Sequence, residues 1–155
     1  MKIIKLVVIA FTSLASTACY SLHDECRQNA GNRLVSDAKY SEGFKLLKSC
    51  ENDQSVTGLT LGQLAVLYGD FGFGEFKTKK ERAQKIYDLY LMAAAKGNED
   101  AVMTLISIFD SGEPLILLAP NPSVSECLSV LADAENYQAE KINGCIGEID
   151  RKYYD

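Results

Sequence analysis

The sequence predicts an all-α protein, built as a short α-solenoid of stacked helical hairpins. Apolar residues recur with a helical period almost throughout the chain, which is typical of amphipathic helices that share a core. Glycine-containing breaks separate the helical stretches, and two hairpin-length units are alike at an offset of about 40 residues. No segment makes a convincing strand, because the apolar string Leu115–Leu118 lacks β-branched enrichment and a partner.

Capping residues and apolar spacing place the expected helices along the chain. They cover approximately residues 24–38, 40–51, 59–68, 79–96, 99–110, 123–135 and 138–152. The first is capped by Ser21 or Asp24, and the second has Phe44 and Leu47 on its apolar face. Each helix is short, so its stability depends on packing against neighbours.

Turn and cap residues mark the helix ends. Thr57 or Thr60 opens the third helix, and the sequence Phe71-Gly72-Phe73-Gly74 follows its end. Gly97 stands where a glycine just past a helix belongs, and Asn98 caps the next helix. Ser123 or Ser125 is expected to cap the sixth.

Two helical hairpins have similar residues at corresponding positions. Leu64, Tyr68 and Gly72 match Leu105, Phe109 and Gly112, while Tyr90-Leu91 with Ala94 matches Val130-Leu131 with Ala134. A partial earlier copy begins at Tyr40. A single hairpin cannot bury its apolar face alone, so such units stack into a solenoid.

The best-preserved unit also carries a family motif. Leu64-Ala65-x-x-Tyr68-x-x-Phe71-Gly72-Phe73-Gly74, followed by Ala83, Tyr87, Ala93-Ala94 and Lys96-Gly97-Asn98, resembles the Sel-1-like repeat, a relative of the tetratricopeptide repeat. The resemblance covers about residues 60–98 and is degenerate over 99–136, where the apolar insertion Leu115–Pro120 replaces the glycine turn. The motif consists of packing residues, so it implies about two to three repeats and a fold more than a function.

The N-terminal segment indicates export. Residues 1–18 combine two lysines, an apolar run and small residues ending at Ala18, as a secretory signal peptide does. Residues 19–155 then form a single helical repeat domain. One interpretation makes Cys19 the lipid attachment site of a lipoprotein, and the other is ordinary cleavage after Ala18. If Cys19 is lipidated, Tyr20 is the residue that follows the lipid anchor. Lipoproteins with a residue other than aspartate at this position resemble those sorted to the outer membrane. We therefore expect a periplasmic protein anchored to the outer membrane.

The remaining four cysteines suit an oxidising compartment. With Cys19 lipidated, Cys26, Cys50, Cys127 and Cys145 form two disulfides and leave no thiol over. We expect Cys26–Cys50 and Cys127–Cys145, each across one terminal hairpin, although four cysteines allow three pairings. The terminal hairpins lack a stacking neighbour on one side, which is where such a brace stabilises most.

Composition limits the partners. Without Lys2 and Lys5, 14 basic residues face 21 acidic ones, a net charge of −7 for the mature chain. Nucleic-acid affinity rests on basic residues at phosphates, so this balance argues against a nucleic-acid partner and against docking on anionic lipid by charge. It is compatible with a basic protein partner. Any membrane contact is expected through the lipid alone.

The sequence offers no catalytic or metal-binding constellation. His23 is the only histidine, no Cys-x-x-Cys occurs, and Gly72-x-Gly74 follows a helix rather than a strand, so it fails the context of a dinucleotide site. Acidic residues such as Glu99-Asp100 lie on expected helix surfaces. We expect a protein that is not an enzyme and that carries no cofactor or metal.

The function expected is the binding of one protein partner. Small secreted Sel-1-like lipoproteins resemble immunity proteins, which neutralise toxins that rival cells deliver into the periplasm. The alternative is an envelope scaffold with several weak partners. An exposed apolar patch marks an interface, and acidic neighbours would suit a basic partner. The candidate contact residues are Leu115, Ile116, Leu117, Leu118, Phe71, Phe73, Asp110 and Glu113. The alternative is that the loop Leu115–Leu118 folds back to cap the last hairpin and that Phe71 and Phe73 fill the core.

Overall fold

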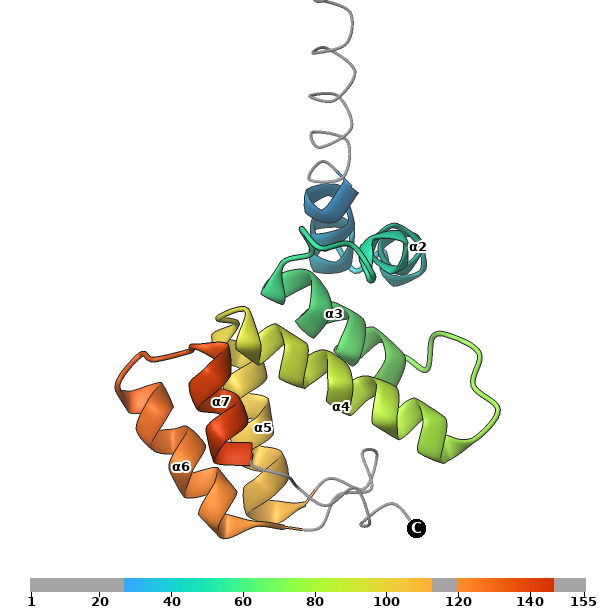
Figure 1. The fold of residues 1–155 in the computed structure, drawn as a ribbon. Coiled ribbons are helices and arrows are strands. Elements are labelled where there is room, and N and C mark those ends of the chain that lie inside the picture. The colour runs from blue at the N-terminus through green and yellow to red at the C-terminus, as the bar shows by residue number, and fades with distance from the viewer. Residues whose placement is uncertain (1–26, 113–119, 147–155) are drawn as a thin grey trace, which may run out of the picture.

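The computed structural model describes residues 27–112 and 120–146, and they form a stack of helices (Figure 1). The described part of the first helix covers residues 27–36. The others are α2 (Tyr40–Cys50), α3 (Gly58–Gly69), α4 (Lys79–Ala95), α5 (Glu99–Ser111), α6 (Pro122–Asp133) and α7 (Ala139–Ile146). Within the described ranges, β pairing is limited to a single bridge between Lys96 and Gln138. The predicted all-α solenoid of stacked hairpins is confirmed.

Neighbouring hairpins share one continuous core. Helix α3 packs on α4, and α5 packs on α6, so each pair makes one hairpin; α4 joins the two by packing on α5. Helix α7 closes the stack against both α6 and α4. The largest fully buried side chains are contributed by α2 to α7 and include Leu47, Leu64, Tyr68, Leu89, Phe109, Leu128 and Ile142.

Side-chain caps start the helices at defined residues. Of the two threonines expected at α3, Thr57 is the cap, and its hydroxyl accepts a hydrogen bond from the Thr60 amide at 3.2 Å. Asn98 caps α5 as predicted. The prediction of Ser123 or Ser125 at α6 is wrong: Asn121 is the cap, because Pro122 behind it has the fixed φ that suits the first helical position.

The turn between α3 and α4 requires two glycines. Gly72 and Gly74 have φ of +67° and +82°, a region that other residues rarely adopt. Gly74 also lies against the Tyr68 ring, where a Cβ would come within 2.6 Å of Cε1. The turn thereby folds back over α3 and directs its phenylalanines towards α2.

The first hairpin is attached to α3 through a buried amide. Gln28 is 2 % exposed, and its Oε1 accepts hydrogen bonds from the Thr57 amide at 2.9 Å and the Thr60 hydroxyl at 3.2 Å. Its Nε2 donates to the Ser55 carbonyl at 3.4 Å. Because an unpaired buried amide is costly, this network fixes the position of the first helix relative to α3.

Candidate functional site

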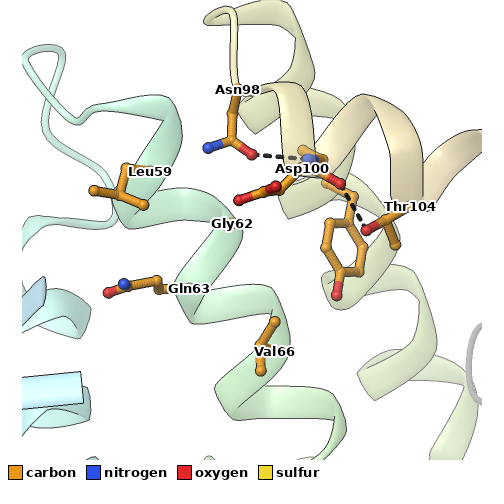
Figure 2. Close-up of a pocket in the computed structure, with 9 residues that line it drawn as sticks. Leu59, Gly62, Gln63, Val66, Asn98, Asp100 and Thr104 are labelled. Carbon is orange, nitrogen blue, oxygen red and sulfur yellow. Dashed lines mark hydrogen bonds between the residues drawn. The ribbon is translucent and has the colours of Figure 1, made fainter. Parts of the chain in front are cut away.

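A groove lies between α3 and α5. It contains a pocket of about 150 Å³ (Figure 2). The two helices are not consecutive in the chain, and both pack on α4, which places Tyr90 of α4 among the lining residues. The lining consists of Leu59, Gly62, Gln63, Val66, Tyr90, Asn98, Asp100, Ala101 and Thr104.

The α3 wall of the groove is apolar at Leu59 and Val66 and carries one polar side chain, the amide of Gln63. Helix α3 uses Leu61, Leu64 and Tyr68 for the core, and the 3.6-residue period leaves Leu59 and Val66 on another face. Leu59 is 48 % exposed. Between them, Gly62 presents no side chain, so the groove stays open at this point.

The α5 wall of the groove is polar. The Asn98 Oδ1 accepts a hydrogen bond from the Ala101 amide at 2.8 Å, which caps the helix and leaves the Nδ2 donors uncommitted among the described residues. Thr104 donates to the Asp100 carbonyl at 2.7 Å, so this bond engages the backbone of Asp100. Figure 2 shows the Asn98 and Asp100 side chains extending towards Gly62 of α3.

Negative charge gathers around this end of α5. Glu99 and Asp100 lie in its first turn, and both are exposed. Partial burial, and then the charges of Glu99, Glu135 and Asp133, raise the pKa of Tyr137. Over residues 86–112 and 120–146, eight acidic side chains face two basic ones, a net charge of −6.

The groove therefore has the features of a binding site. One wall is mostly apolar and the other offers amide donors and a carboxylate, a division common in pockets that orient a ligand. The lining contains no histidine, cysteine or serine to act as a nucleophile. Nowhere in the described ranges do three or more His, Cys, Asp or Glu residues form a group that could hold a metal ion.

The groove residues are absent from the sequence-predicted candidates. The half-exposed face of α3 at residues 59, 62, 63 and 66 has helical spacing, so the sequence did carry a signal for it. That α5 lies beside this face follows from the packing of both helices on α4, which no local pattern encodes.

The sequence-predicted contact residues that the structure describes, Phe71, Phe73 and Asp110, do not line the groove. Leu115, Ile116, Leu117, Leu118 and Glu113 lie outside the described residues. Asp110 is exposed in the last turn of α5.

The two turn phenylalanines instead pack against α2. Phe73 is partly buried and stacks on Phe44, with ring centroids 5.0 Å apart. Phe71 stays 45 % exposed, and its centroid is 4.1 Å from that of Tyr40. Phe73 therefore serves packing, while Phe71 leaves an apolar edge in solvent.

Of the two expected disulfides, one falls on described residues. Cys127 of α6 and Cys145 of α7 are joined, with Cα atoms 5.5 Å apart. Cys50 is buried at the end of α2, and its expected partner, Cys26, lies outside the described residues. The Cys26–Cys50 pairing stays a prediction, as do lipidation of Cys19 and cleavage after residue 18.

A buried carboxylate at the α2–α3–α4 junction was not predicted. Glu51 is 4 % exposed and accepts hydrogen bonds from Lys48 at 2.6 Å and from the Tyr68 hydroxyl at 3.0 Å; Lys85 of α4 pairs with its other oxygen. Burial alone would raise the pKa of Glu51, but the hydrogen bonds from Lys48 and Lys85 outweigh it and hold the pKa below its ordinary value. The cluster is a structural joint, because every group in it is already paired.

Comparison with known proteins adds no assignment. Protein-family models, curated proteins and solved structures gave no match to this chain. The Sel-1-like resemblance therefore rests on the motif over residues 60–98 alone. None of the helices in the described residues is long and apolar enough to cross a membrane.

Proposed function

We propose that this protein is a periplasmic binding module that neutralises one specific protein partner, in the manner of an immunity protein against a secreted toxin. The observation that carries the proposal is the groove between α3 and α5, with Leu59 half-exposed beside a pocket and uncommitted donors on the facing wall. Binding is the chemistry that such a lining supports. The Sel-1-like motif adds the comparison with immunity proteins, and the protein acts without catalysis.

The proposed location follows from the signal-like segment. A leader over residues 1–18 and a lipid on Cys19 would hold the domain at the inner face of the outer membrane, and the protein would meet its partner in the periplasm. The disulfide between Cys127 and Cys145 supports this proposal, because disulfides persist in oxidising compartments.

The test is a pair of matched surface variants. Leu59→Asp places a charge in the groove at the second position of α3, where an acidic residue is favourable to the helix, so folding should be unaffected. Met92→Asp is the control: it changes a residue of similar exposure, 45 %, that lies outside the groove lining. Both variants should keep the wild-type melting temperature within about 2 °C, as surface changes usually do.

Native affinity purification from envelope extracts of the source cells and of close rivals then separates the hypotheses. A dedicated neutraliser retains one stoichiometric partner in high salt, loses it with Leu59→Asp and keeps it with Met92→Asp. That partner should kill cells that lack this protein. Several substoichiometric envelope proteins, retained equally by both variants, would support the scaffold hypothesis instead and would remove the groove from the interface.

A further inference from the structure

We propose that the groove between α3 and α5 accepts a lysine or arginine side chain of the protein partner, with its cation at Asp100. The aliphatic stem would lie along Leu59 and Val66. This inference rests on the proposed function, since it names the chemistry by which the partner is anchored.

The size of the pocket suits a single side chain. A cavity of about 150 Å³ is large enough for a group the size of benzene, so one long side chain fills it. The α3 wall offers the apolar side chains of Leu59 and Val66, with the amide of Gln63 between them, and the carboxylate of Asp100 stands on the opposite side. Lysine and arginine match this division, because they pack a methylene stem on apolar surface while keeping the charged end in a polar setting.

Electrostatics favours a cation over an anion here. The N-terminus of a helix would ordinarily attract negative charge. At α5 the positive end of the helix dipole already faces two acidic residues of the protein, because Glu99 and Asp100 lie in the first turn. The Asn98 side chain also accepts a hydrogen bond from the Ala101 amide. The described residues 86–112 and 120–146 around it have a net charge of −6, so an approaching cation is steered towards this end.

Asp100 is available for the contact. Among the described residues its carboxylate makes no ion pair, and the Thr104 hydroxyl bonds to its backbone oxygen. Asn98 stands beside it with free Nδ2 donors, which can donate a hydrogen bond to the peptide carbonyl that follows the anchor residue. A cation at Asp100 therefore completes a set of polar contacts that the protein leaves open.

The experiment titrates the purified ¹⁵N-labelled protein with four small probes: the N-acetyl, N-methylamide derivatives of lysine, arginine, norleucine and glutamate. Norleucine keeps the aliphatic stem and lacks the charge. We expect lysine and arginine to bind in the millimolar range and to move the amide signals of Leu59, Gly62 and Ala101. Norleucine should bind roughly tenfold more weakly, because a hydrogen bond to a charged group is worth about 1.5 kcal/mol. Glutamate should not bind.

Two matched carboxylate variants test whether the cation of the probe binds at Asp100. Asp100→Asn should bring lysine and norleucine to equal affinity, whereas Glu99→Gln, which removes a neighbouring charge outside the pocket lining, should leave the preference for lysine within about twofold. Equal binding of lysine and norleucine by the wild type, signals that move elsewhere, or no binding of any probe would overturn the inference. If Leu59→Asp still abolishes partner capture in that case, the proposed function stands and only the cationic anchor fails.

Discussion

Replacing Glu51 with glutamine tests the joint that connects α2, α3 and α4. The carboxylate of Glu51 is 3 % exposed and receives two lysines and the Tyr68 hydroxyl. Glutamine has nearly the same shape, so the change removes the charge and leaves the packing. The side chains of Lys48 and Lys85 are 50 % and 34 % exposed, which lets solvent recover part of what each loses.

The magnitude follows from these three contacts. Each partly exposed lysine pair contributes about 0.5 kcal/mol after screening, and the buried bond from Tyr68 to a charged acceptor contributes about 1.5 kcal/mol. Glutamine keeps a weaker acceptor for Tyr68, so we expect a loss of about 2 kcal/mol in the free energy of unfolding. For a domain of this size that lowers the melting temperature by roughly 6–10 °C.

Urea unfolding followed by circular dichroism measures this loss, with Glu75→Gln as the control. Glu75 is an exposed carboxylate in the nearby turn, and its replacement should change the free energy of unfolding by less than about 0.5 kcal/mol. The pH dependence provides a second readout. Because the pKa of Glu51 is lowered on folding, its stabilisation is present above the ordinary value of 4.5 and is lost as the pH falls below it. Equal stabilities of the two variants, or an unchanged acid profile for Glu51→Gln, would refute this account of the joint.

Three further predictions concern the turn, the disulfide and the phenol at the joint. Gly74→Ala should lower the free energy of unfolding by about 3 kcal/mol, because it combines a φ of +82° with displacement of the Tyr68 ring. Gly97→Ala, with a φ of +78° and no neighbour within 4 Å, should lower it by only about 1 kcal/mol. Equal losses of the two variants in denaturant unfolding would contradict this difference. Reducing the Cys127–Cys145 disulfide, which closes a loop with a sequence separation of 18, should lower the free energy of unfolding by about 3 kcal/mol, measured with and without reductant. Burial, and then the charge of Glu51, raise the pKa of Tyr68, so stability should fall as the pH rises above its ordinary value of 10; a Tyr68→Phe variant that shows the same alkaline loss would contradict this.

The sequence was informative wherever a feature depends on near neighbours. Asn98 and Gly97 act within one turn of a helix end, so their residue types locate the start of α5 and the end of α4, and the sequence narrows the start of α3 to Thr57 or Thr60. The error at α6 has the same local character. Asn121 and Ser123 are both good caps, and Pro122 between them decides for Asn121 because it cannot donate a hydrogen bond from inside the helix.

Features made by distant residues could not be found in this way. Glu51 appears in the sequence as one charge at the end of a helix, and it becomes buried because Lys85 of α4 and Tyr68 of α3 meet there. The groove has the same origin, since Leu59 and Asp100 are 41 positions apart and become neighbours through α4. Periodicity identifies which face of a helix is apolar, but it does not identify which other helix that face will meet.

The charge distribution shows why the difference between local features and features made by distant residues matters for function. The acidic composition indicated a basic partner, but it gave no location for the contact. In the structure the described residues 27–85 carry ten basic and seven acidic side chains, whereas the later described residues have a net charge of −6. The excess of negative charge therefore belongs to the half that contains α5, and Asp100 is the carboxylate of that half that lines the pocket. Composition thus predicts the sign of the partner's charge, and the fold selects the residue that meets it.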